Sequence, residues 1–272
     1  MSFTENESTK IYWDEEGHGE PVLLIMGLGY ASRLWYRIRP ALANRFRTIA
    51  FDNRGVGQSD VPPGPYSIAT MAADAAAVLD AAGVARAQVF GVSMGGMIAQ
   101  EFALRYPSRT RSLILGCTSP GGPLATRADK SVSDILVAHG MTLEEARRAI
   151  LPYIYDAGTP REKIEEDTRL RRECLPTFEG YMAQLQAILG WESYSRLHEI
   201  AVPTLVIHGR TDALIPPANG ELLAKTIRGA KLVLLDHASH LFLTDQTDAA
   251  EKVILEFLSS NSASEITARA GD

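Results

Sequence analysis

The sequence predicts an α/β fold in which a mostly parallel, twisted sheet is covered by helices on both faces and interrupted by a helical insertion. Short apolar runs, typical of strands buried on both faces, alternate with stretches of helical length. This alternation stops after Thr118 and resumes at Pro203, and the segment between them has only helical patterns. We therefore expect a core domain of residues 1–118 and 199–272, with a helical cap of residues 119–198.

The first part of the core contains apolar runs that end in glycine-rich or polar turns. The predicted strands are residues 10–13, 22–26 and 48–51, a run that ends at Phe90, and residues 112–116. The predicted helices are residues 33–43, the alanine-rich stretch 67–82 and residues 97–106. Because each strand is followed by a helix, the strands are expected to pair in parallel.

The cap is predicted as four amphipathic helical stretches. A capping box at Thr142 and Glu145 opens one of them, and Pro160 and Pro176 lie at later boundaries. The second part of the core then has predicted strands at residues 203–207 and 231–235 and predicted helices at 217–227 and 248–258. The polar tail from Ser259 is expected to fray.

Composition limits the class of protein. The 272 residues carry a net charge of −6, which disfavours nucleic acid and an anionic membrane surface as partners. The start has no basic segment followed by an apolar one, and no apolar run approaches the ~20 residues of a membrane span. The two cysteines, Cys117 and Cys174, fit no metal-binding or redox spacing. We expect a cytoplasmic protein with reduced thiols and no metal site.

A sharp turn is predicted between the strand that ends at Phe90 and the helix of residues 97–106. It places Ser93 between Gly91 and Gly95, and small residues at these positions keep the strand and helix from colliding. The serine would take a strained backbone conformation and project above a helix N-terminus, which stabilises a developing anion. We interpret Ser93 as a nucleophile; the alternative is a glycine-rich turn with a serine N-cap.

An acid and a base follow later strands. Asp212 lies just beyond the strand of residues 203–207, and His240 lies just beyond residues 231–235. The carboxyl ends of parallel strands share one edge of a sheet, so Ser93, Asp212 and His240 are expected to meet there. An imidazole can take the serine proton and return it to the leaving group, while a buried carboxylate holds the imidazole tautomer.

Other residues compete for these roles. His237 is the alternative base, and Asp248 is the alternative acid, although it lies inside a predicted helix. His208 is interpreted as a packed structural histidine, and Asp52 and Arg54 as parts of a rigid loop. Two backbone N–H groups are predicted to form an oxyanion hole: that of Met94, directly after the nucleophile, and that of Leu28, in the loop after the strand of residues 22–26.

With these motifs, the chain resembles the α/β-hydrolase superfamily, in its esterase, enol-lactonase and haloperoxidase-like branch. The resemblance spans about Lys10 to Leu258, and the insertion matches only as a helical cap. The matching motifs are Gly91-Val92-Ser93-Met94-Gly95-Gly96, Asp52-Asn53-Arg54-Gly55-Val56-Gly57-Gln58-Ser59, Gly209-Arg210-Thr211-Asp212, and Ser239-His240 with Asp245. Many members carry His-Gly in the oxyanion loop, where this chain has Met26-Gly27, so the N–H donor remains but the hydrogen bonds of that histidine are lost.

The resemblance implies an α/β-hydrolase fold and a serine carboxylic-ester hydrolase that acts on short-to-medium acyl esters without a metal or organic cofactor. Lactonase activity on an acyl-homoserine lactone or an enol-lactone is the leading alternative, and the net acidity is taken to disfavour an anionic enol-lactone. Perhydrolase activity and a non-catalytic receptor rank lower. Dehalogenases and epoxide hydrolases are excluded because they carry an aspartate on the elbow. The oligomeric state is left open.

A dinucleotide-binding reading of Gly27-Leu28-Gly29 with Asp52 would leave the serine, the acid and the histidine unexplained. Under the hydrolase reading, the cap roofs the site and its apolar residues line an acyl pocket. The residues expected to line it are Tyr155, Phe178, Tyr181, Met182 and Trp191.

Overall fold

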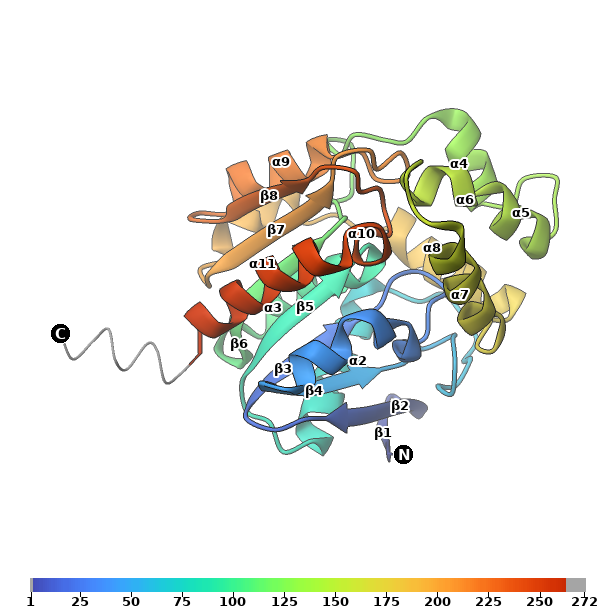
Figure 1. The fold of residues 1–272 in the computed structure, drawn as a ribbon. Helices are drawn as coiled ribbons and strands as arrows, with labels where there is room; N and C mark the ends of the chain where they lie inside the picture. Colours follow the sequence, from blue (N-terminus) through green and yellow to red (C-terminus); the bar gives the residue numbers. More distant parts are fainter. Residues whose placement is uncertain (1, 263–272) are drawn as a thin grey trace.

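The computed structural model describes residues 2–262, and within them the chain forms a sheet of eight strands with helices on both faces (Figure 1). The strands are β1 (Ser2–Asn6), β2 (Thr9–Glu16), β3 (Glu20–Ile25), β4 (Phe46–Phe51), β5 (Ala87–Val92), β6 (Thr110–Gly116), β7 (Thr204–Gly209) and β8 (Lys231–Leu235). Their order in the sheet is β1-β2-β4-β3-β5-β6-β7-β8. Strands β3 to β8 pair in parallel, while β1 and β2 form an antiparallel edge.

The core helices connect these strands. They are η1 (Ser32–Arg37), α1 (Arg39–Ala43), α2 (Ile68–Ala81), α3 (Met94–Arg105), η2 (Pro107–Arg109), α9 (Ala218–Thr226), α10 (Phe242–Asp245) and α11 (Thr247–Ser260). The prediction of one helix over residues 33–43 is wrong, because the chain forms a 3-10 helix and then restarts as α1 with Pro40 in its first turn. A proline inside a continuous helix would remove a backbone hydrogen bond, whereas a first turn tolerates it.

The N-terminal strand β1 was not predicted from the sequence. Its residues alternate between partly buried and exposed, and it pairs only with β2 at the edge of the sheet. Phe3 contacts Tyr12 across this pair, with ring centroids 5.6 Å apart. An edge strand with one partly covered face needs few apolar residues, so its sequence lacks the continuous apolar run of the central strands.

Two apolar layers hold the sheet. Leu23 and Ile25 of β3 face the layer under α2 and α3, while Val22 and Leu24 face the layer under η1 and α11. All four side chains are fully buried. A shift of β3 by one residue would exchange the two faces, so the packing fixes the register. This register brings the carboxyl ends of β3, β5, β6, β7 and β8 to one edge of the sheet.

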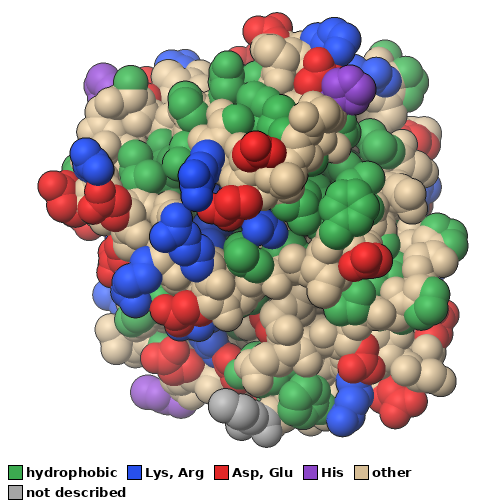
Figure 2. All heavy atoms as spheres, turned by 90° about the vertical axis from the view of Figure 1, so that its right-hand side faces the viewer, with side chains coloured by type: hydrophobic (Ala, Val, Ile, Leu, Met, Phe, Trp, Pro, Cys, Tyr) green, Lys and Arg blue, Asp and Glu red, His purple; other side chains and the backbone are tan. Residues whose placement is uncertain are grey.

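The cap lies between β6 and β7 and is helical. Its helices are α4 (Lys130–Leu136), α5 (Leu143–Ala149), α6 (Leu151–Ile154), α7 (Arg161–Arg172), α8 (Phe178–Leu189) and η3 (Tyr194–Glu199). The predicted capping box at Thr142 and Glu145 is present. The second of the four predicted stretches is divided into α5 and α6, with Pro152 in the first turn of α6. The cap helices α4 to α8 gather at one end of the molecule (Figure 1), where basic side chains group among acidic and apolar ones (Figure 2).

The end of the described chain departs slightly from the prediction. Helix α11 continues to Ser260, so the first residues of the predicted polar tail are helical. Residues 263–272 of that tail lie outside the described residues. Across residues 2–262, each helix falls short of the length and apolarity that crossing a membrane requires.

Candidate active site

The turn between β5 and α3 has the strained geometry that the sequence predicts. Ser93 has φ +56° and ψ −122°, a conformation that side chains other than glycine rarely adopt. A Cβ atom on Gly91 would lie 2.0 Å from the carbonyl oxygen of Gly95, and one on Gly95 would lie 2.1 Å from that of Ile25. Both glycines are therefore required for the close approach of strand, turn and helix.

Hydrogen bonds to β6 and the segment after it hold this turn. The N–H of Ser93 donates to the carbonyl oxygen of Gly116 at 2.8 Å, and the hydroxyl of Thr118 donates to the carbonyl oxygen of Ser93 at 2.7 Å. A strained residue of this kind costs about 1–3 kcal/mol, so it persists only where its surroundings fix it. Ser93 itself is partly exposed and lines a cavity.

The structure brings Asp212 and His240 together. Asp212 follows β7 and His240 follows β8, and Nδ1 of His240 lies 2.8 Å from Oδ2 of Asp212. Both residues are buried, and His240 lines the same cavity as Ser93. With Nδ1 bonded to the carboxylate, Nε2 of the imidazole is free to act as a base toward that cavity.

Asp212 is held in its charged form. Burial alone would raise its pKa, but His240 and His208 outweigh that effect and bring the pKa well below its ordinary value. Its other oxygen, Oδ1, accepts hydrogen bonds from the N–H groups of Leu214 and Ile215, both at 2.9 Å. The carboxylate is thus fixed in orientation and remains ionised at neutral pH.

The competing residues occupy other positions. His237 is exposed, and Asp248 is an exposed residue of α11. His208 is fully buried, with Nε2 2.8 Å from the carbonyl oxygen of Ile215 and 3.3 Å from Oδ2 of Asp212. Since a carbonyl oxygen only accepts, Nε2 carries the proton, and His208 helps to hold the acid. Asp52 organises its loop by accepting hydrogen bonds from backbone N–H groups.

The predicted oxyanion residues, Leu28 and Met94, both line the cavity beside Ser93. Within residues 2–262, neither backbone N–H group is bonded to a protein acceptor. A Cβ atom on Gly27 would lie 3.0 Å from Cβ of Ser93, so the loop passes very close to this serine. The arrangement leaves two N–H groups available for an oxygen that bears negative charge.

The cap reaches this loop through a buried glutamine. Oε1 of Gln184 in α8 accepts a hydrogen bond from the N–H of Gly29 at 2.8 Å, and its Nε2 donates to the carbonyl oxygen of Arg54 at 2.7 Å. From the core, Nδ2 of Asn53 donates to the carbonyl oxygen of Met26 at 2.9 Å. The sequence did not single out Gln184, because an amide inside an amphipathic helix carries no signal of its partner.

The cavity lies between the sheet edge and the cap and has a volume of about 460 Å³. Of the five residues predicted to line it, the structure places only Tyr181 there. Phe178 is 57 % exposed, Met182 lies elsewhere on α8, and Nε1 of Trp191 donates to Glu101 at 2.9 Å. Apolar lining residues from the cap include Ile135, Leu136, Ile150, Ile154, Leu185 and Ile188.

Tyr155, the remaining residue predicted to line the cavity, binds a buried carboxylate instead. Its hydroxyl donates to Asp167 at 2.9 Å, and the hydroxyl of Thr244 donates to the same oxygen at 2.7 Å. The other oxygen of Asp167 accepts from Tyr36 at 2.5 Å and from Arg37 at 3.0 Å. Asp167 thereby joins α7 to η1 and to α10, the helix that follows His240.

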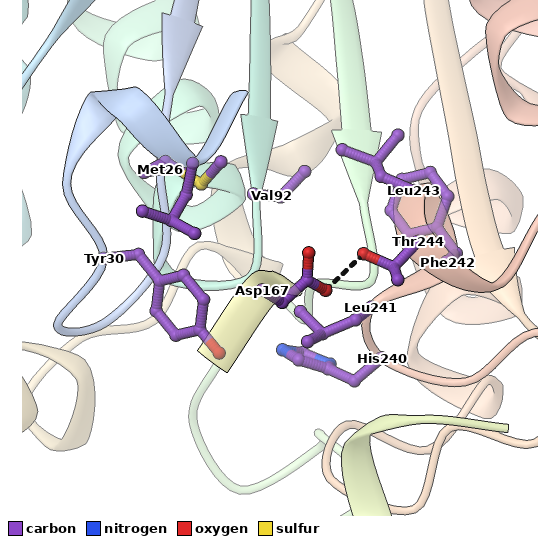
Figure 3. A pocket seen from close by; sticks show the side chains of 10 residues that line it. Met26, Tyr30, Val92, Asp167, His240, Leu241, Phe242, Leu243 and Thr244 are labelled. Carbon is purple, nitrogen blue, oxygen red and sulfur yellow. Dashed lines mark hydrogen bonds between the residues drawn. The ribbon is translucent and has the colours of Figure 1, made fainter. Parts of the chain in front are cut away.

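A small second cavity of about 50 Å³ lies beside that network and is lined in part by Asp167 and Thr244. Figure 3 shows His240, Tyr30 and Asp167 around it, with the bond between Thr244 and Asp167 drawn. It is lined mostly by apolar side chains. The imidazole of His240 therefore has the large cavity and this small one as neighbours.

One group of potential metal ligands forms only in the folded chain. Cys117, Asp212 and His240 place their ligand atoms within 4.8 Å of one another, although their sequence spacing suggests no metal site. Asp212 and His240 already bond each other, and burial together with the Asp212 carboxylate raises the pKa of the Cys117 thiol well above its ordinary value. A neutral thiol is a poor metal ligand, so the group fits a metal ion badly.

Comparison with known proteins gives one consistent result. Residues 20–152 match a family model described as the alpha/beta hydrolase fold, and residues 191–267 match one described as TAP-like protein. The chain is 34% identical to a putative carbamate hydrolase of Azorhizobium caulinodans, over 94% of this chain and 98% of the relative. It is 35% identical to a poly(3-hydroxyalkanoate) depolymerase of Ectopseudomonas oleovorans, over 89% and 85%. The crystal structure of the enol-lactonase from Burkholderia xenovorans superposes with a TM-score of 0.83 at 27% identity, over 95% of this chain and all of that one.

Proposed function

The chain belongs to the α/β-hydrolase family, and from that premise we propose that it is a serine carboxylic-ester hydrolase that forms an acyl-enzyme on Ser93. The observation that carries the proposal is that Ser93, His240, Leu28 and Met94 all line one cavity, with His240 bonded to a buried, ionised Asp212. Such a site supplies a nucleophile, a base and two oxyanion donors together.

In the first half-reaction, Oγ of Ser93 attacks the carbonyl carbon of the ester while Nε2 of His240 takes the hydroxyl proton. The carbonyl oxygen becomes an oxyanion and accepts hydrogen bonds from the N–H groups of Leu28 and Met94. When the tetrahedral intermediate collapses, the carbon–oxygen bond to the alcohol breaks and His240 returns the proton to the departing oxygen. Asp212 stabilises the imidazolium that exists between these two steps.

In the second half-reaction, water replaces the alcohol. His240 takes a proton from water, the hydroxide attacks the acyl carbon, and the same two N–H groups bind the oxyanion. Collapse of this intermediate breaks the bond to Oγ, which recovers its proton from His240, and the carboxylic acid leaves. The volume of about 460 Å³ and the apolar cap residues favour a short-to-medium acyl chain.

Kinetics on p-nitrophenyl esters test the assignment. We expect Ser93→Ala to lower kcat by about 10⁴-fold or more, and Asp212→Asn by about 10⁴-fold because the imidazole tautomer is no longer held. His240→Ala should be nearly as severe as Ser93→Ala. The matched control is His237→Ala, which should leave kcat/KM nearly unchanged. Activity that survives His240→Ala but not His237→Ala would show that the base is wrongly assigned.

Lactone hydrolysis is the second candidate, and the enol-lactonase structure that resembles the whole chain favours it. A lactone presents the same acyl carbon, but its hydroxyl stays tethered to the acyl-enzyme and can close the ring again. The test is kcat/KM for an N-acyl-homoserine lactone against that for a p-nitrophenyl ester of equal acyl length. Because the activated ester is intrinsically easier to cleave, a lactone rate equal to it or higher would favour lactonase.

A further inference from the structure

The cap contributes arginines to the cavity that contains Ser93. Arg147 of α5, Arg171 of α7 and Arg127, which precedes α4, all line it. Among the described residues that line this cavity there is no aspartate or glutamate. The cavity therefore combines a mostly apolar wall with a concentration of positive charge, although the chain as a whole has a net charge of −6.

The two helical arginines are poorly compensated by the protein. Nη2 of Arg147 is buried without a hydrogen-bond partner, and the carboxylate of Glu144 lies 4.0 Å from its Nη1. Arg171 forms no ion pair with a carboxylate of residues 2–262. Its guanidinium lies over the ring of Tyr30, 4.2 Å from the centroid. Tyr30 also lines the cavity, so this contact holds Arg171 at the cavity wall.

The arginines also act on each other. Burial and the nearby Arg171 lower the pKa of Arg147. Neighbouring like charges that are partly removed from water cost stability unless an anion neutralises them. The planar guanidinium presents parallel N–H donors on neighbouring nitrogens, a geometry that matches a carboxylate, and Nη2 of Arg147 has its donors unused by the protein.

We propose that Arg147 and Arg171 form an anion subsite, so that the substrate of this hydrolase carries a carboxylate at the end remote from the bond that is cleaved. This inference rests on the proposed function and narrows it to carboxylate-bearing esters or lactones, for which Arg127 adds positive charge to the cavity. The net charge of −6 is taken in the sequence analysis to disfavour an anionic substrate, and this inference reverses that expectation. The substrate contacts the cavity wall, whose charged side chains are arginines.

A pair of substrates isolates the carboxylate. The anionic one is mono-p-nitrophenyl adipate, and the neutral one is its methyl ester, which has the same acyl chain and the same leaving group. We expect the wild-type protein to have the higher kcat/KM for the anionic ester, after the uncatalysed rate is subtracted. Equal rates, or a preference for the methyl ester, would overturn the proposal.

The variants Arg147→Gln and Arg171→Gln should each lower kcat/KM for the anionic ester about tenfold or more and leave the neutral ester almost unchanged. The matched controls are Arg148→Gln and Arg172→Gln, one residue along the same helices, where both arginines are exposed. Equal losses on both esters would show that the two arginines only support the cap, and would contradict an anion subsite.

Binding of adipate to the wild-type protein, measured by calorimetry, separates failure of this inference from failure of the proposed function. If neither ester is hydrolysed, the hydrolase assignment fails, but the subsite can still be judged. Adipate binding that Arg147→Gln and Arg171→Gln abolish and the two control variants keep would support the subsite. Absence of binding, or binding that does not depend on these arginines, would overturn it.

Discussion

Ser93 reaches the cavity because Gly91 and Gly95, two residues before and two residues after it, have no side chains to obstruct the turn. A Cβ atom on Gly95 would overlap backbone atoms of β3, and backbone cannot move aside as a flexible side chain can. We therefore expect Gly95→Ala to lower the free energy of unfolding by about 3 kcal/mol or more. Urea denaturation measures this change.

Gly190 provides the control for that experiment. A Cβ atom there would have only the carbonyl oxygen of Gln186 near it, at 3.5 Å, which is an ordinary contact. Gly190→Ala should therefore change the free energy of unfolding by no more than about 1 kcal/mol. If Gly95→Ala were as stable as Gly190→Ala, the turn would be able to accommodate a Cβ atom, and the prediction would be wrong.

The proximity of Cys117 to Asp212 and His240 raises the question of metal dependence. The proposed mechanism assigns His240 to proton transfer, which a metal bound at the imidazole would block. We expect full activity after exhaustive dialysis against a chelator, measured on a p-nitrophenyl ester. Activity that is lost on dialysis and restored by zinc would contradict the mechanism.

Among the elements, the central strands could be predicted and the cap contacts could not. The runs at Val22–Met26 and Ser112–Gly116 are apolar on both faces, which is a property of the sequence itself. A helix such as α8 also shows an apolar face, but its pattern does not say whether a side chain meets the cavity, the core or solvent. This is why Phe178 and Trp191 were misplaced. The position of Arg147 could not be predicted either, since its long side chain turns toward a cavity only once α5 is docked.

Helix α8 contacts the oxyanion loop through Gln184. Gln184→Leu would remove both hydrogen bonds of the amide and leave the N–H of Gly29 and the carbonyl of Arg54 without these partners. We expect the free energy of unfolding to fall by about 1–3 kcal/mol, and kcat to fall because the neighbouring N–H of Leu28 is no longer held in place.

The same substitution at an exposed position of α8, Gln186→Leu, is the matched control and should leave kcat unchanged. The measurements are kcat on a p-nitrophenyl ester and thermal unfolding for both variants. A Gln184→Leu protein with lowered stability but unaltered kcat would show that the amide supports the cap and does not position the loop.

Across the whole molecule, buried carboxylates join the cap to the core. Glu101 of α3 is 2 % exposed and accepts hydrogen bonds from Arg196 at 2.8 Å, Trp191 at 2.9 Å and Arg105 at 2.5 Å. Burial alone would raise its pKa, but these three donors outweigh it and lower the pKa below its ordinary value of 4.5. The charged form of Glu101 is therefore bound more favourably in the folded state than in the unfolded one.

The ionisation of Glu101 makes the stability of the fold depend on pH. A lowered pKa contributes stability that is fully present above pH 4.5 and is lost as the pH falls through the folded-state value. The Tm of Glu101→Gln should thus be lower than that of the wild-type protein at pH 7. When the pH is lowered from about 5 to about 3, the Tm of the variant should fall by less than the Tm of the wild-type protein. The exposed Glu179→Gln is the control, with an unchanged profile. Parallel Tm curves for Glu101→Gln and wild type would contradict this account.

The placement of the cap between β6 and β7 also has a consequence for synthesis. Ser93 is synthesised before the cap. Strands β7 and β8, which are followed by Asp212 and His240, are synthesised only after the cap. A nascent chain therefore carries Ser93, the proposed nucleophile, throughout the synthesis of the cap, before Asp212 and His240 are made. Because β7 and β8 complete the parallel sheet through contacts distant in sequence, closure of the sheet and onset of hydrolysis should coincide late in synthesis.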